Sequence, residues 1–302
     1  MESRTRPKPV VLAILDGWGI TQPSPANPLS LAKLPNFQKF QDNYPVATLQ
    51  ASGESVGLSW GELGNSEVGH LSLGAGKIIY QSLPRINRSI ADGSFFSNPA
   101  FMAACEQVKK QQSKLHLMGL LSSGGVHAYY EHLYALIELA KNQGVEQIYV
   151  HVFLDGRDMP FNSGLDQVAK LQRKLIQFGV GKIASLSGRF YAMDRDNHWE
   201  RIEQVFKAMV QGVAERQGPD PIKLIEESYS QQNYDEEFIP TIITKEDGTP
   251  QAVVAENDAV IFFNFRADRA RELTKAFVLP SFSKFSRPYL KNLFFVSLME
   301  YE

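Results

Sequence analysis

The sequence predicts an α/β fold, with largely parallel sheets flanked by helices. Three observations support this prediction. Short aliphatic runs alternate with helical patterns, the helical patterns have recognisable start and stop residues, and polar residues suited to ligand binding follow several apolar runs directly. At 302 residues the chain is long enough for two domains. Its hydrophobic fraction of 43% and charged fraction of 21% are those of a globular protein with a substantial core.

The expected strands are short β-branched or aliphatic runs bounded by polar or turn residues. They are Val10–Leu15, Leu115–Leu121, Gln147–Leu154, Lys182–Leu186, Ala259–Phe265 and Leu293–Leu298. Helical patterns separate most of these runs, and parallel strands need such crossover connections. We therefore expect mainly parallel pairing.

The expected helices carry clear end signals. Asn98 can cap a helix that takes Pro99 at its first position, where the missing N–H costs nothing. A second helix over residues 130–142 has apolar residues on one face and ends before Gly144. Further helices are expected over residues 164–178, 198–213 and 268–278, and a shorter periodic segment covers residues 34–41.

Charge and cysteine content exclude several classes of protein. A net charge of −2 with interspersed signs gives no reason to expect nucleic acid or an anionic membrane as a partner. The single cysteine, Cys105, cannot form an intramolecular disulfide, and its apolar neighbours predict a buried, inert thiol. The apolar run at Val10–Leu15 is too short for the core of a signal peptide, and no stretch approaches membrane-spanning length. We expect a cytoplasmic monomer.

Ser66 lies in the unusual stretch GELGNSEVGHLSLGAG, between Gly61 and Gly76. It could simply cap a helix after Asn65. It could also be a nucleophile, because backbone N–H groups at a helix start favour an incoming phosphate. A serine hydroxyl needs a base or a metal to draw off its proton. Asp16, which directly follows the first apolar run, could ligate such a metal together with Ser66, or could instead be an ordinary turn aspartate.

A second group of polar residues follows the later apolar runs. Taken singly, each arginine of this group would be a surface residue or part of an ion pair, and the histidine would be structural. Three strand ends that each deliver guanidinium groups nevertheless indicate a shared site for a small, multiply charged anion such as a phosphorylated acid. The residues are His127, Asp155, Arg157, Asp158, Arg189, Asp194, Arg195, Arg266, Asp268, Arg269 and Arg271.

Six ordered motifs carry a family resemblance: VLAILDGWG, GNSEVGH with LGAG, GGVHA, DGRD, SGRFYAMDRD and NFRADRAR. Together they resemble the metal-dependent, cofactor-independent phosphoglycerate mutases, from about residue 10 to the end of the sequence. That family interconverts 3-phosphoglycerate and 2-phosphoglycerate in glycolysis and gluconeogenesis, without 2,3-bisphosphoglycerate. Its members join an alkaline phosphatase-like domain to an inserted transferase-like domain.

The resemblance implies a role for each matching residue. Ser66 would be the nucleophile that forms a phosphoserine, and Asp16 and Ser66 would ligate one of two manganese ions. Asp158 would act as acid and base for the glycerate hydroxyls. The substrate would be held by His127, Arg157, Asp158, Arg189, Arg195, Arg266 and Arg269.

The resemblance also implies a domain division: residues 1–79 as part of the phosphatase-like domain, 80–299 as the transferase-like insert, and 300–302 as the return to the first domain. The family's remaining metal ligands and a catalytic lysine have no counterpart in this sequence. We therefore expect a fragment that is inactive alone, whose first strand would lack sheet neighbours. Two alternatives remain: a metal-dependent phosphate-ester hydrolase of the same superfamily, and a non-catalytic phosphoglycerate-binding fragment.

Overall fold

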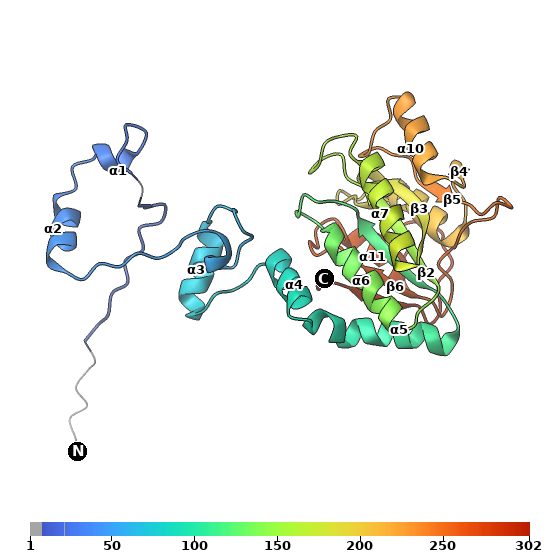
Figure 1. Cartoon of the computed structure of the whole chain (residues 1–302), viewed down its shortest axis with the longest axis horizontal. Coiled ribbons are helices and arrows are strands. Elements are labelled where there is room, and N and C mark those ends of the chain that lie inside the picture. The colour runs from blue at the N-terminus through green and yellow to red at the C-terminus, as the bar shows by residue number, and fades with distance from the viewer. Residues whose placement is uncertain (1–7, 21) are drawn as a thin grey trace, which may run out of the picture. The chain divides into compact units, whose positions relative to one another are not determined.

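The computed structural model describes residues 8–20 and 22–302. The chain divides into two compact units, Met1–Gln81 and Ser82–Glu302 (Figure 1). The predicted first domain, 1–79, includes residues 1–7 and 21, which lie outside the described residues. Among the described residues, no helix is both long enough and apolar enough to cross a membrane.

The first unit contains short helices joined by long loops. Its elements are α1 (Pro28–Leu31), α2 (Pro35–Asn43), the 3₁₀ helix η1 (Gly53–Val56) and α3 (Ser66–Ala75). The strand predicted at Val10–Leu15 is wrong for this structure: the segment is irregular, and Val10 and Val11 are 95% and 84% exposed. The described residues of this unit contain no strand at all, so the segment has no neighbour to pair with its backbone or to cover its side chains.

The second unit is built on a seven-stranded sheet in the order β4-β5-β3-β2-β1-β6-β7. All neighbouring strands pair in parallel except β3 and β5. The strands are β1 (Leu115–Leu120), β2 (Ile148–Leu154), β3 (Lys182–Gly188), β4 (Arg216–Gly218), β5 (Thr241–Ile243), β6 (Ala259–Phe262) and β7 (Phe294–Ser297). The α/β prediction is confirmed, as are all the predicted strands beyond residue 80.

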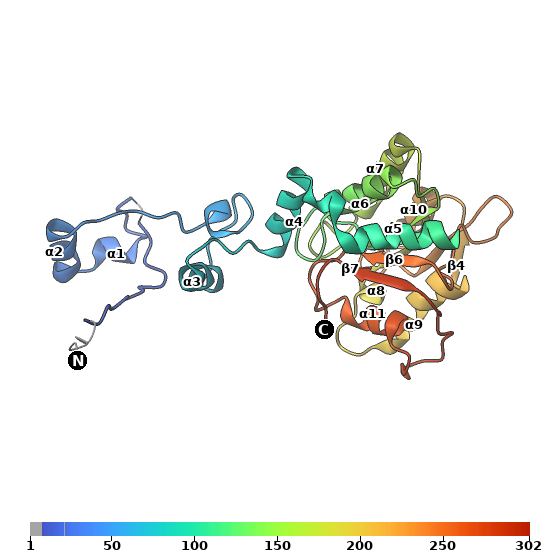
Figure 2. The same cartoon turned by 90° about the horizontal axis from the view of Figure 1, so that it is seen from below.

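Helices cover both faces of this sheet, with α5 and α6 on one face and α9 and α11 on the other (Figure 2). The helices are α4 (Ser82–Ala91), η2 (Ser94–Ser97), α5 (Pro99–Gln111), α6 (Tyr130–Asn142), α7 (Gly164–Phe178), α8 (Arg189–Ala192), α9 (Trp199–Phe206), η3 (Lys207–Gln211), α10 (Pro221–Ser230) and α11 (Arg271–Val278). The predicted cap of α5 is confirmed, because Asn98 Oδ1 accepts a hydrogen bond from Ala100 N at 2.9 Å. The helix expected over residues 198–213 is shorter than predicted and passes into a π-helical turn, η3.

Cys105 lies on the buried face of α5, with 1% of its surface exposed. Burial raises the pKa of its thiol to about 11. The prediction of a buried, inert thiol is confirmed, because the reactive thiolate is disfavoured.

Candidate functional site

The carboxyl ends of β3, β2, β1 and β6 meet at one edge of the sheet, because these four strands are neighbours and run parallel. The loops that follow them carry the predicted anion-binding residues of the second unit. The loop after β1 is tied directly to the loop after β6: His127 O accepts a hydrogen bond from Phe265 N at 2.8 Å. The sheet topology therefore brings together residues that are far apart in the sequence.

Arg189 is the buried centre of this cluster. Its Nη1 donates to Asp155 Oδ1 at 2.7 Å and to Asp158 Oδ2 at 2.6 Å, and only 2% of its side chain is exposed. Burial disfavours the guanidinium charge, but the hydrogen bonds that Arg189 donates to Asp158 and Asp155 outweigh that effect and raise the pKa of Arg189. Asp155 Oδ1 also accepts from the backbone N–H groups of Arg157 and Asp158, which shapes the loop after β2. Arg189 is thus a fixed cation that orients Asp158.

His127 lies between two carboxylates. Its Nε2 is 3.9 Å from Asp158 Oδ2 and its Nδ1 is 3.5 Å from Asp268 Oδ1. Asp268 also accepts a hydrogen bond from Arg195 at 2.9 Å and forms an ion pair with Arg266 Nε at 3.2 Å. Burial, and then the charge of Arg189, lower the pKa of His127 to about 4. The imidazole is therefore neutral near pH 7.

Arg157 and Arg269 complete the set of guanidinium groups. Arg157, half exposed, forms an ion pair with Glu236 at 3.3 Å. Arg269 Nη1 donates to Met193 O at 3.1 Å. Burial lowers the pKa of Arg269, and the charges of Arg195, Arg189 and Arg157 lower it further. Arg269 therefore experiences the positive field of its neighbours, which an anionic ligand would relieve.

Two residues of the predicted group have structural contacts instead. Asp194 accepts from the backbone of Asp196 and His198, both at 2.9 Å, and pairs with Arg201. Arg271 Nε donates to Tyr301 O at 2.6 Å. Both side chains serve to hold loops and the end of the chain in place.

Sequence reasoning missed Glu236, the partner of Arg157. It lies in the irregular stretch between α10 and β5, where no periodic pattern or strand end distinguishes it. Only the tertiary fold places it beside the loop after β2.

In the first unit, Ser66 and Asp16 are in direct contact. Ser66 Oγ donates to Asp16 Oδ2 at 2.6 Å, although both side chains are exposed. The helix cap is Asn65, whose side chain accepts from Val68 N at 3.0 Å, so the alternative in which Ser66 itself caps the helix is wrong. Ser66 is instead the first residue of α3, at the helix end that favours anions.

His70 lies one turn further along α3 and was not predicted as a site residue. Its Nδ1 is 2.8 Å from Ser66 O and 3.3 Å from Ser66 Oγ. A carbonyl oxygen can only accept, so Nδ1 carries the proton and cannot serve as a base toward the Ser66 hydroxyl. Asp16 is the group placed to accept that proton.

The donors in the first unit match only part of a divalent-ion site. Asp16 and Ser66 offer oxygen atoms, which magnesium and manganese accept. No group of three or more His, Cys, Asp or Glu residues that could hold a metal ion occurs among residues 8–20 and 22–302. The described residues therefore do not complete a metal centre by themselves.

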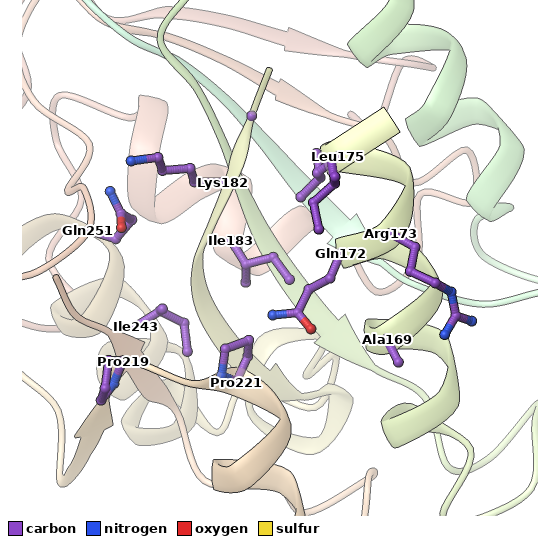
Figure 3. Close-up of a pocket in the computed structure, with 12 residues that line it drawn as sticks. Ala169, Gln172, Arg173, Leu175, Lys182, Ile183, Pro219, Pro221, Ile243 and Gln251 are labelled. Carbon is purple, nitrogen blue, oxygen red and sulfur yellow. The ribbon is translucent and has the colours of Figure 1, made fainter. Parts of the chain in front are cut away.

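A separate pocket of about 460 Å³ lies near the start of β3, at the opposite end of that strand from Arg189 (Figure 3). Its walls are mainly apolar and come from α7, the start of β3 and the segments around Pro219 and Ile243. It contains none of the predicted site residues, so it is distinct from the arginine cluster.

The fold and the site define a class of protein: an α/β protein with a cluster of guanidinium groups at the carboxyl edge of a mainly parallel sheet. A family model described as "BPG-independent PGAM N-terminus" matches residues 86–302, more than half of the chain. The chain belongs to this family.

Curated relatives agree with this assignment. The chain is 48% identical over 295 residues to "2,3-bisphosphoglycerate-independent phosphoglycerate mutase 1" of Methanosarcina barkeri. It is 50% identical over 295 residues to "2,3-bisphosphoglycerate-independent phosphoglycerate mutase" of Clostridium beijerinckii. In both cases 98% of this chain matches 57% of the relative's length.

A solved structure is similar as well. It is described as "Crystal structures of Leishmania mexicana phosphoglycerate mutase at low cobalt concentration" and superposes with a TM-score of 0.75 at 32% sequence identity. The match covers 95% of this chain and 54% of that one.

Proposed function

We propose that this chain forms part of an enzyme that interconverts 3-phosphoglycerate and 2-phosphoglycerate through a phosphoserine at Ser66, in cytoplasmic glycolysis and gluconeogenesis. The observation that carries the proposal is the cluster of five guanidinium groups, from Arg157, Arg189, Arg195, Arg266 and Arg269, at one sheet edge. Guanidinium groups match carboxylate and phosphate oxygens bidentately, and phosphoglycerate carries both groups. The relatives' names and the sequence motifs support the same reading.

In the proposed reaction Ser66 Oγ forms a bond to phosphorus while the bond from phosphorus to the glycerate oxygen breaks. Asp16 accepts the Ser66 proton, consistent with the 2.6 Å hydrogen bond between them. Asp158, which would enter the reaction in its protonated form, gives that proton to the departing glycerate oxygen and later takes one from the other hydroxyl, to which the phosphate returns. The contact of Asp158 with Arg189 supports this role, because it fixes the orientation of the carboxylate.

The arginines and His127 have the task of retaining glycerate between the two transfers. Without retention, water would take the phosphate and the enzyme would act as a phosphatase. A divalent metal, which we propose to be manganese, would supply positive charge at the hydroxyl and the phosphate. Asp16 and Ser66 would be two of its ligands. We further propose that residues 1–79 belong to the phosphatase-like domain and 80–299 to the transferase-like insert.

The first experiment measures binding of 3-phosphoglycerate to the 302-residue chain by calorimetry. We expect binding that Arg266→Ala or Arg157→Ala weakens at least about tenfold, the usual worth of a charge-assisted contact. Arg173→Ala is the matched control, since Arg173 is an exposed arginine on α7 beside the separate pocket. Absence of binding by the unmodified chain would refute the proposed role of the arginine cluster.

The second experiment follows products with manganese present. We expect no turnover from the chain alone, because its described residues supply too few metal ligands. Conversion of 3-phosphoglycerate to 2-phosphoglycerate by the purified chain would contradict that expectation. Release of free phosphate without 2-phosphoglycerate would favour the hydrolase. Binding without either product is the expected result for the chain alone, whether it is part of the mutase or a binding fragment.

A further inference from the structure

Asp268 is a carboxylate inside the arginine cluster for which the proposed reaction has no use. It lies in the loop between β6 and α11, and 27% of its side chain is exposed. A negative charge at this point repels the anionic ligand that the cluster would bind. The contacts of Asp268 with neighbouring side chains indicate a different role for this carboxylate.

The two oxygens of Asp268 contact side chains from three different loops. Oδ2 accepts from Arg195 Nη1 at 2.9 Å, after β3, and Oδ1 is 3.2 Å from Arg266 Nε, after β6. Oδ1 is also 3.5 Å from His127 Nδ1, after β1. Within the described part of the chain, neither Asp268 Oδ1 nor His127 Nδ1 has a partner that meets the geometry of a hydrogen bond. One carboxylate thus links the parts of the site contributed by three strands.

We propose that Asp268 is a positioning residue, which holds Arg195, Arg266 and His127 in the arrangement that receives phosphoglycerate. This inference rests on the proposed function of the cluster. Arg195 and Arg266 are 45% and 50% exposed. Long, half-exposed side chains otherwise lose rotamer freedom when a ligand binds, and fixing them beforehand reduces that cost.

The sign of the effect distinguishes this role from simple electrostatics. Removing a negative charge beside an anion site strengthens anion binding by Coulomb's law alone. Removing a positioning group weakens binding, because the guanidinium groups must then be ordered by the ligand itself. The two explanations therefore predict opposite changes in affinity.

The test is calorimetric binding of 3-phosphoglycerate to the 302-residue chain and to Asp268→Ala and Asp268→Asn. We expect the alanine variant to bind about tenfold more weakly. The asparagine variant should be intermediate, because it keeps the size of the side chain and one acceptor oxygen. Asp166→Asn, which removes an exposed carboxylate on α7, is the control and should leave the affinity unchanged. Equal or tighter binding by Asp268→Ala overturns the proposal.

A second measurement decides the same question without ligand. The Nε–H signal of Arg266, assigned by its loss in Arg266→Lys, is followed by proton–nitrogen NMR. We expect it to move toward the position of free arginine in Asp268→Ala and Asp268→Asn, but not in Asp166→Asn. An unchanged Arg266 signal in both Asp268 variants also overturns the proposal. Failure of the unmodified chain to bind 3-phosphoglycerate would instead refute the proposed function, and the NMR result would still show whether Asp268 holds Arg266.

Discussion

Neutral, buried histidines should make the second unit sensitive to acid, and His132 on α6 is the clearest case. None of its surface is exposed. Its Nε2 donates to Asn87 Oδ1 at 2.8 Å, and its Nδ1 is buried without a partner in the described chain. Burial lowers the pKa of His132 to about 4. An unfolded chain would titrate this histidine near 6.5.

The sign and size of the effect follow from these two pKa values. As the pH falls through about 6.5, the unfolded chain binds a proton that the folded chain does not bind until about pH 4. The stabilising contribution is therefore complete above about pH 6.5 and is lost as the pH falls toward 4. For His132 alone, the free energy of unfolding should drop by about 2.5 kcal/mol between pH 7.5 and pH 4.5.

The assay compares the unmodified chain with His132→Gln by urea unfolding, followed by circular dichroism at several pH values. Glutamine does not titrate, and its amide can still donate to Asn87. The ring contact with Phe265, at 5.7 Å between centroids, is lost. We expect a loss of about 1–2 kcal/mol at pH 7.5. The further loss on acidification should be smaller than in the unmodified chain by about 2.5 kcal/mol.

Asn87→Ala is the matched control for this prediction. It removes the hydrogen-bond acceptor but keeps the titrating ring, so it should lower stability while retaining the acid slope of the unmodified chain. The burial argument fails if the profiles of free energy against pH for the unmodified chain and His132→Gln run parallel from pH 7.5 to 4.5.

Two further predictions concern the buried groups of the same unit. Arg189→Met leaves Asp155 buried without its counter-charge. The free energy of unfolding, measured in urea, should therefore fall by about 3–5 kcal/mol. The double variant with Asp155→Asn should recover part of that loss, and no recovery would show that the ion pair is not the cause. Cys105, whose pKa burial raises to about 11, should react with iodoacetamide at pH 8 only after unfolding. Labelling of the folded chain would contradict its burial.

The central strands could be predicted from sequence because they are buried on both faces and therefore appear as continuous apolar runs. Every residue of β1 and β6 is buried. The strands β4 and β5 could not be predicted, because three residues each are too few to form a recognisable run. Val10–Leu15 shows the converse error. Its apolar pattern is typical of a buried strand, but a pattern cannot report whether neighbouring strands are present.

The location of the arginine cluster could also be predicted, since it follows from strand ends and parallel pairing. The individual contacts could not. Asp158 and Asp268 both occur in charged loop motifs, yet one orients toward buried Arg189 and the other toward exposed Arg195 and Arg266. Those differences depend on loop conformation, which short motifs do not encode. The same limit explains why Glu236 was missed.

The arginines of the cluster differ in how fully neighbouring carboxylates balance their charge. Arg189 contacts two carboxylates at 2.6–2.7 Å, and its contact with Asp158 holds that side chain in place. Arg157 forms its ion pair at 3.3 Å from an exposed position, and Arg195 and Arg266 share the single carboxylate of Asp268. These guanidinium groups remain under-compensated and repel one another. Burial, and then the charges of Arg195, Arg189 and Arg157, lower the pKa of neighbouring Arg269. A ligand with both phosphate and carboxylate groups would offset this repulsion more completely than a single charge could, which supports the proposal of a phosphorylated acid as the ligand.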